Sequence, residues 1–185
     1  MKKILILFCA LAVTGASAQS KFFTKKGKIT FDATTPDSPE QIRAKNENVV
    51  SVIDLSSGAM EFMLSMTAFS FEKALMQEHF NENYVESEKF PKANFKGSIV
   101  NLKDVSLLKD ANYPVNIKGN MTIHGVTKEV TATGTLTVKG GTLTAGKSEF
   151  KLHLPDYGID IPNLVSDKLS KDAKIKVDLV YEPVK

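Results

Sequence analysis

Apolar and polar residues alternate with a period of two along most of this 185-residue chain. The clearest stretch runs from Val130 to Val138, where Thr131, Thr133, Thr135 and Thr137 occupy every second position. Successive side chains of a strand point to opposite faces, so this stretch predicts a strand with one polar and one apolar face. Other segments with strand-like character are Ile29 to Phe31, Val49 to Leu55, Met60 to Met66, Phe95 to Ile99, Val115 to Ile123, Phe150 to Leu154 and Ile175 to Tyr181.

Short turn sequences separate several of these strands. Glycine in such turns supplies the positive φ that tight hairpins require, so they predict antiparallel neighbours. A connection rich in turn residues runs from Thr34 to Glu40, and a longer one from Pro155 to Lys171. The tight turns are Ser56-Ser57-Gly58, Gly125 and Gly140-Gly141.

One segment, Phe71 to Asn83, departs from the period of two. Its apolar stripe has helical spacing, with Ser70 as the expected N-cap and Asn81 and Asn83 as stop residues. We therefore predict a short helix over about 71–83 that covers an open end of the sheet. The stripe consists of Leu75, Met76, His79 and Phe80.

The expected fold is all-β, an antiparallel lipocalin-like closed barrel of about eight strands, because closure leaves no exposed edge. A barrel of this size is either filled by side chains or holds one small ligand. Small residues recur on the apolar faces of these strands. A glycine there can mark a β-bulge or a barrel corner, but an alanine adds no backbone freedom. The set of small residues as a whole therefore favours an unfilled, dry interior. The small residues on or near the apolar face are Gly97, Gly119, Ala132, Gly134 and Ala145.

The first 18 residues have the pattern of a secretory signal peptide. Lys2 and Lys3 precede an apolar run from Ile4 to Val13, and Ala16-Ser17-Ala18 forms a cleavage site. This run is too short to span a bilayer. We expect residues 19–185 to form one exported domain, in the periplasm or secreted.

The amino-acid composition excludes several kinds of functional site. Cys9 is the sole cysteine and falls in the predicted signal peptide, so disulfides, thiolate metal sites and a cysteine nucleophile are excluded from the exported chain. The net charge of +3 gives no reason to expect nucleic acid as a partner. No apolar run after residue 18 approaches the ~20 residues of a membrane helix.

Three sequence motifs stand out along the chain. They are Met76-Gln77-Glu78-His79-Phe80 with Glu88 to Gly97, then Gly119-Asn120-Met121-Thr122-Ile123-His124-Gly125-Val126-Thr127-Lys128, and Asp156-Tyr157-Gly158-Ile159. Together they resemble the motifs of the YceI-like family of exported lipid-binding proteins, whereas the region from Thr34 to Asn48 does not match the family's pattern. The resemblance implies a lipocalin-like barrel with an elongated apolar channel that holds polyisoprenoid chains, including isoprenoid quinones, and it favours the periplasm.

Candidate catalytic chemistry is sparse. His79, His124 and His153 have no metal-ligand spacing, and we expect neither a metal nor a cofactor. No nucleophile elbow, phosphate loop or dinucleotide fingerprint is present. His124 precedes Gly125 and either binds a ligand's polar head at the barrel rim or, as we favour, holds the turn. No catalytic residue is assigned.

Three hypotheses follow from the sequence. The first is an exported protein that holds a long apolar lipid of the isoprenoid type for transport, storage or sequestration. The second is a barrel enzyme, an isomerase or hydrolase using His124, and the third is a structural or stress-related envelope protein with a filled core. The oligomeric state, a dimer included, stays open. The expected ligand contacts are Phe62, Leu64, Met66, Phe69, Phe80, Phe95, Ile117, Met121, His124, Ala132, Gly134 and Leu136.

Overall fold

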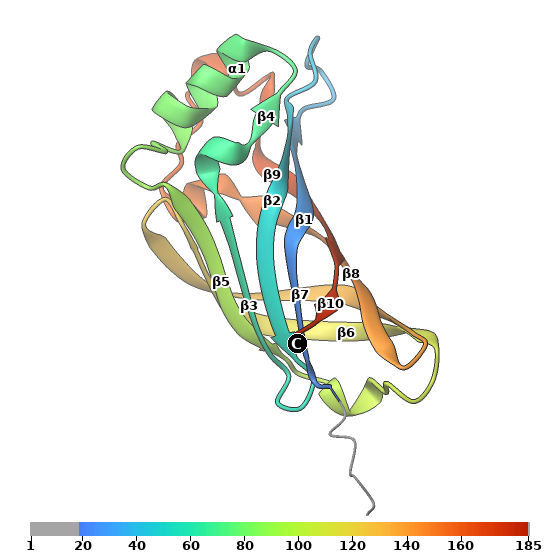
Figure 1. Cartoon of the computed structure of the whole chain (residues 1–185). Helices are drawn as coiled ribbons and strands as arrows, with labels where there is room; N and C mark the ends of the chain where they lie inside the picture. Colours follow the sequence, from blue (N-terminus) through green and yellow to red (C-terminus); the bar gives the residue numbers. More distant parts are fainter. Residues whose placement is uncertain (1–18, 185) are drawn as a thin grey trace, which may run out of the picture.

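The computed structural model describes residues 19–184; the predicted signal peptide, with Cys9, lies outside the described residues. All strands belong to one antiparallel sheet in the order β10-β1-β9-β8-β7-β6-β5-β3-β2-β4, and a further pairing of β1 with β2 closes it (Figure 1). Eight long strands form the closed barrel, and the two-residue strands β4 and β10 extend it. The predicted fold is confirmed.

The strands are β1 (Lys21–Thr34), β2 (Arg43–Asp54), β3 (Ala59–Ser65), β4 (Ser70–Phe71), β5 (Lys92–Ile99), β6 (Ala111–Ile123), β7 (Val126–Lys139), β8 (Thr142–His153), β9 (Leu169–Val180) and β10 (Glu182–Pro183). The helical segments are η1 (Met66–Ala68), α1 (Ala74–His79), η2 (Phe80–Tyr84), η3 (Leu102–Asp104), η4 (Leu154–Tyr157) and η5 (Asn163–Val165). No helix within residues 19–184 is both long enough and apolar enough to cross a membrane.

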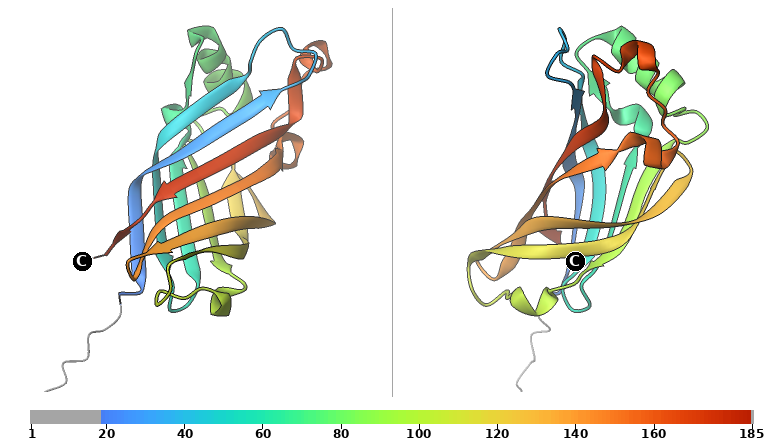
Figure 2. Two further views of the ribbon diagram at one scale, coloured as in Figure 1. Left: turned by 90° about the vertical axis from the view of Figure 1, so that its right-hand side faces the viewer. Right: turned by 180° about the vertical axis from the view of Figure 1, so that it is seen from behind.

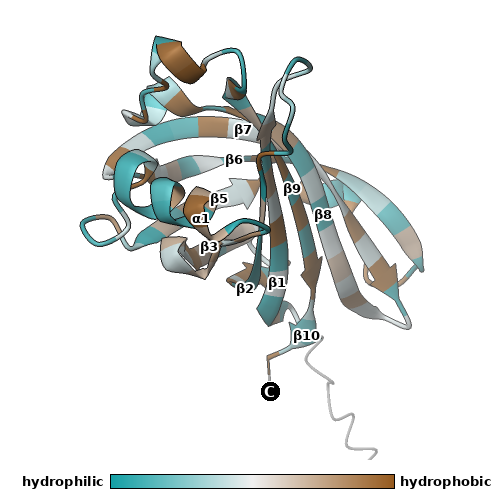
Figure 3. Ribbon diagram, turned by 90° about the horizontal axis from the view of Figure 1, so that it is seen from above, coloured by the Kyte–Doolittle hydropathy of each residue, from teal (hydrophilic) through white to brown (hydrophobic). Residues whose placement is uncertain are grey.

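The alternation seen in the sequence sets the two faces of the barrel wall. In β7, Thr131 and Thr133 are exposed, whereas Leu136 and Val138 are buried. Bands of opposite hydropathy follow one another along the strands (Figure 3). The predicted tight turns are also present, because Gly58, Gly125, Gly140 and Gly141 all have positive φ.

The predicted helix is present but begins later than expected. Ser70 does not cap it: Ser70 and Phe71 pair with β2 as strand β4, and Lys73 precedes the first helical residue without a side-chain cap. Of the predicted stripe, Phe80 is buried, but Leu75 is 61% exposed. The backbone pairing to β2 therefore overrides the local capping signal. Seen from above, α1 lies over part of the barrel's end (Figure 3).

The two halves of the barrel are packed differently. In the half away from α1, which we call the packed half, large apolar side chains are almost completely buried. This half contains the β2–β3 and β7–β8 turns and the start of β1 (Figure 1). Tight packing of such side chains supplies most of the hydrophobic stabilisation. These side chains are Phe22, Val49, Ile53, Val138 and Leu143.

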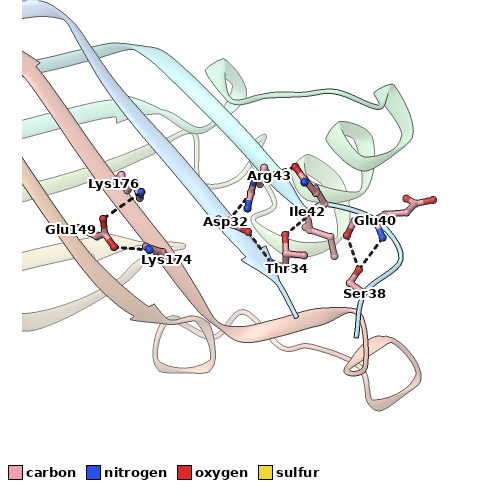
Figure 4. A network of polar contacts seen from close by, with 10 residues as sticks. Asp32, Thr34, Ser38, Glu40, Ile42, Arg43, Glu149, Lys174 and Lys176 are labelled. Atoms are coloured by element: carbon pink, nitrogen blue, oxygen red, sulfur yellow. Dashed lines mark hydrogen bonds and ion pairs between the residues drawn. The ribbon is translucent and has the colours of Figure 1, made fainter. Parts of the chain in front are cut away.

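In the half beneath α1, which we call the hollow half, two connections join the ends of long strands: the loop from β1 to β2 and the segment from β8 to β9. The loop between β1 and β2 is tied by an Arg43–Asp32 ion pair of 2.6 Å and by the Ile42 amide, which donates to the Thr34 hydroxyl at 2.9 Å (Figure 4). Burial would raise the pKa of Asp32, but hydrogen bonds from Thr34 and Arg43 lower it below its ordinary value. The region that the family pattern left unassigned is thus the end of β1, this loop and the start of β2.

The connection from β8 to β9 packs onto the same half. Ile159 and Ile161 are buried, and Gly158 ends η4 with the left-handed conformation that glycine adopts freely. Long connections without regular structure are commonly packed over something, and this one covers part of the barrel end.

Candidate binding cavity

A cavity of about 660 Å³ lies inside the barrel, mostly in the hollow half, and its lining reaches Met60, Gly146 and Tyr181 toward the packed half. Its volume falls in the range of roughly 300–1,000 Å³ that is usual for small-molecule sites. Its wall is mostly apolar and is drawn from the inward faces of the strands, the lid helix and the β8–β9 connection. The alternative of a fully packed core is therefore wrong for this half of the molecule.

Most of the expected ligand contacts line this cavity. They come from β3, η1, η2, β5, β6 and β7, so segments far apart in the sequence face one space. Strand alternation predicted the common inner face of the residues on β3, β5, β6 and β7. They are Phe62, Leu64, Met66, Phe69, Phe80, Phe95, Ile117, Met121, Ala132 and Leu136.

Gly134 and His124 lie outside the lining of the cavity. A Cβ atom at Gly134 would stand 2.7 Å from the backbone carbonyl oxygen of Lys147 on β8. Gly134 therefore allows a close approach of two strands and leaves no space for a ligand.

Two other glycines of the predicted set are covered by a neighbouring ring. Gly97 and Gly119 face each other across β5 and β6, and the Cζ atom of Phe95 would lie 2.6 Å and 2.7 Å from their added Cβ atoms. The aromatic ring thus occupies the place that we expected to be empty, an arrangement known to support glycines in sheets. Ala145 also lies outside the lining, so of the five small residues only Ala132 contributes to the cavity.

His124 holds the turn between β6 and β7, as we favoured. It has a φ of +50°; its Nδ1 lies 3.0 Å from the carbonyl oxygen of Tyr157 and its Nε2 lies 2.7 Å from a carboxylate oxygen of Glu86. The ring of Phe90 packs edge-on against it at 4.5 Å. His124 therefore joins the end of the lid segment to η4 and does not reach the cavity.

The other two histidines are exposed. His79, which we expected to pack beneath the lid, borders the cavity at its edge, and its Nδ1 lies 2.9 Å from the Asn83 amide nitrogen. His153 points outward as the alternation predicted and lies 2.7 Å from Asp172. No group of three or more His, Cys, Asp or Glu side chains that could hold a metal ion occurs within residues 19–184.

Sequence reasoning missed the contribution of β8, β9 and the connection between them. The alternation of Phe150 to Leu154 and of Ile175 to Tyr181 had placed these residues on an apolar face, but it does not say which strands face the same space. Only closure of the barrel brings them opposite β3 and β5. The missed residues include Phe150, Leu152, Ile159, Ile161, Ile175 and Leu179.

Aromatic rings line the cavity beneath the lid. Phe80 lies 5.7 Å from Phe31, 5.4 Å from Phe69 and 5.1 Å from Phe71 between ring centroids. Edge-on and tilted contacts of this kind stabilise aromatic pairs beyond the area they bury. The lid is therefore held on the barrel by a packed aromatic cluster.

The charged side chains that border the cavity are all exposed. They mark places where the cavity meets solvent. Within the described residues the cavity interior thus offers apolar surface and almost no charge, which suits a ligand with a long hydrocarbon portion. The four are Glu40, Lys147, Lys151 and Lys168.

The chain matches the YceI-like domain family over residues 9–181. It belongs to this family. Solved structures share the fold at low sequence identity. A polyisoprenoid-binding domain from Saccharophagus degradans, implicated in plant cell wall breakdown, is 11% identical with a TM-score of 0.72, over 90% of this chain and 99% of that domain.

Two further structures support the same fold. BcnA from Burkholderia cenocepacia is 14% identical with a TM-score of 0.67, over 84% of this chain and 96% of BcnA. The YCEI protein of Campylobacter jejuni is 14% identical with a TM-score of 0.55, over 77% of this chain and 86% of that protein. No curated protein matches the chain.

Proposed function

We propose that this protein binds a long apolar lipid of the isoprenoid type, a polyisoprenoid or an isoprenoid quinone, in the cavity of the hollow half. The observation that carries the proposal is an unfilled apolar space of about 660 Å³ whose charged residues lie only at its margins. Each methylene moved from water into such a space contributes about 0.8 kcal/mol, so a long chain binds without specific polar contacts. A related structure is described as a polyisoprenoid-binding domain, which supports the ligand class.

The protein acts as an exported carrier or sequestering protein in the periplasm, with residues 1–18 as its signal peptide. The basic start, apolar run and small-residue site of that segment support export. The proposal includes no catalytic step, since His124 lies outside the cavity with both ring nitrogens engaged.

The direct test is the identity of whatever lipid accompanies the protein purified from its own host. Native mass spectrometry and organic extraction should find a long-chain isoprenoid lipid, and the emptied protein should take up a fluorescent long-chain probe. Absence of both a co-purifying lipid and probe uptake would contradict the proposal.

A matched pair of variants assigns binding to the cavity. Ala132→Trp fills space that Ala132 borders, so we expect loss of probe binding with the fold retained. Overpacking of a filled core would instead cost about 1–3 kcal/mol. Lys139→Trp, at an exposed position on the same strand, should bind the probe normally. Equal binding by both variants would place the probe elsewhere on the protein.

A further inference from the structure

The hydrogen-bonded ladder between β7 and β8 stops halfway along both strands. It runs from Lys139↔Thr142 to Gly134↔Ser148 and goes no further. Beyond that point, Val126 to Thr133 pairs only with β6 and Glu149 to His153 pairs only with β9 among the described residues. β7 and β8 lie side by side near their shared turn and separate toward the hollow half (Figure 2).

The cavity borders on this separation. Inward residues of both unpaired segments line it: Val130 and Ala132 from β7, Phe150 and Leu152 from β8. Thr131 and Lys151, at the outward positions between these inward residues, also line the cavity although both are exposed. In a closed wall, outward residues do not border the interior, so the cavity opens sideways between the two strands.

Polar groups gather at this opening. The last hydrogen bond between the two strands before the opening is donated by the Ser148 hydroxyl to the Thr133 carbonyl oxygen at 2.7 Å. A shallow outer hollow of about 330 Å³ adjoins it and shares Lys147, Ser148 and Val177 with the cavity. The unpaired strand edges add backbone N–H and C=O groups to these hydroxyls.

Most charges around the outer hollow are already paired. Lys147 lies 3.5 Å from Asp178. Glu149 contacts Lys174 at 2.7 Å and Lys176 at 3.5 Å (Figure 4). These ion pairs join the outer face of β8 to β9, and none of them reaches β7. Lys151 has no ion-pair partner among residues 19–184, so with the Thr131 hydroxyl it leaves hydrogen-bond donors free at the opening.

We propose that the lateral opening between Val126–Thr133 of β7 and Glu149–His153 of β8 is the ligand portal, and that the polar end group of the bound lipid rests there. The inference rests on the proposed lipid-binding function and adds the route and the orientation. An end group with acceptor oxygens accepts hydrogen bonds from Thr131 and Lys151 while the apolar chain extends beneath the lid. The aromatic cluster at Phe80 packs the lid segment onto the opposite end of the cavity.

The test is a reversible bridge across the opening. If the register continued beyond Gly134↔Ser148, Thr131 would face Lys151. In the full chain with Cys9→Ser, we would introduce Thr131→Cys with Lys151→Cys and join the two thiols with a cleavable bismaleimide. The bridged protein should take up a fluorescent long-chain alcohol at least about tenfold more slowly than the unbridged one, as a modest rise in the entry barrier would produce. Protein loaded before bridging should release the probe equally slowly.

The matched control is Thr137→Cys with Ala145→Cys. These positions are register partners in the paired part of the same two strands, so bridging them should leave uptake unchanged. Equal uptake rates for bridged and unbridged Thr131/Lys151 protein would overturn the portal and leave lipid binding intact. Failure of the Cys9→Ser protein, with Thr131 and Lys151 intact, to bind the probe at all would overturn the proposed function, and the portal with it.

A measurement on the unmodified protein locates the end group. A long-chain probe with a photoreactive benzophenone at its polar end should cross-link to peptides containing residues 126–133 or 147–153. Cross-links confined to α1 or to residues 35–42 would place the end group at the lid and overturn the inference.

Discussion

The packed half and the hollow half of the barrel are built from the same long strands but differ in how completely those strands pair. In the packed half, β7 and β8 are joined from Gly134 to their turn, and Val138 and Leu143 are almost inaccessible. In the hollow half the same two strands part, and a cavity lies behind them. Stability and ligand space are thus assigned to different parts of one sheet.

The difference shows that a barrel wall need not be hydrogen-bonded along its whole height. Unpaired strand edges are tolerated where they face solvent, because water satisfies their backbone groups. The ladder from the β7–β8 turn to Gly134 holds these two strands in register, so the seam beyond it can stay open. The predictions below change one half at a time.

The largest effect is expected from a matched pair of phenylalanine truncations. Phe22→Ala empties a site in the packed half where the side chain is 1% exposed, so it should lower the free energy of unfolding by about 3–5 kcal/mol. Phe62→Ala enlarges a cavity that already exists and removes a half-buried ring, so about 1–2 kcal/mol is expected. Urea denaturation measures both. Equal losses would mean that the two halves are packed alike.

The end of the β7–β8 ladder is tested by adding a methyl group to it. Gly134→Ala brings a Cβ within 2.7 Å of the Lys147 carbonyl oxygen, so we expect a loss of about 1–3 kcal/mol in unfolding free energy and faster uptake of the long-chain probe. Gly119→Ala on β6 creates a contact of 2.5 Å with Gly97 Cα and should destabilise without changing the uptake rate. A change of the uptake rate in both variants would mean that the opening between β7 and β8 does not control probe uptake.

His124 tests how the lid segment is fastened to η4. His124→Asn keeps a residue that tolerates positive φ but removes the ring contacts to Glu86 and Tyr157, so about 1–2 kcal/mol of stability should be lost. Long-chain probe binding should persist, because the ring lies outside the cavity. His153→Asn, which breaks an exposed pair with Asp172, should change stability by less than about 0.5 kcal/mol. Loss of probe affinity in His124→Asn alone would show that this contact shapes the cavity.

The smallest effect at neutral pH concerns Tyr181, a buried residue that lines the cavity. Burial raises its pKa to about 12, although a hydrogen bond with the Ser51 hydroxyl at 2.9 Å acts in the opposite direction. Because the folded-state pKa lies above the unfolded value of about 10, the stabilisation is fully present below pH 10 and is lost as the pH rises through 12. Unfolding measured between pH 9 and 12 should show this decline, and Tyr181→Phe should make it shallower. If the pH dependence of stability were the same in Tyr181→Phe, titratable groups other than Tyr181 would cause the decline.

The sequence by itself determined the faces of the wall. Alternation requires only the local geometry of an extended chain, so it placed Phe62, Met121 and Leu136 on the inner side and the threonines of β7 on the outer side. The glycine turns could also be predicted, since the freedom to adopt positive φ is a property of the residue itself.

The tertiary structure alone decided which inner positions are filled and where the wall is open. Phe95 covers Gly97 and Gly119, and the pairing of Phe71 with β2 delays the lid helix, because both depend on segments distant in the sequence. The same holds for the seam beyond Gly134. A period of two fixes the face toward which a side chain points, whereas the partner along each strand edge is fixed only when the sheet closes on itself.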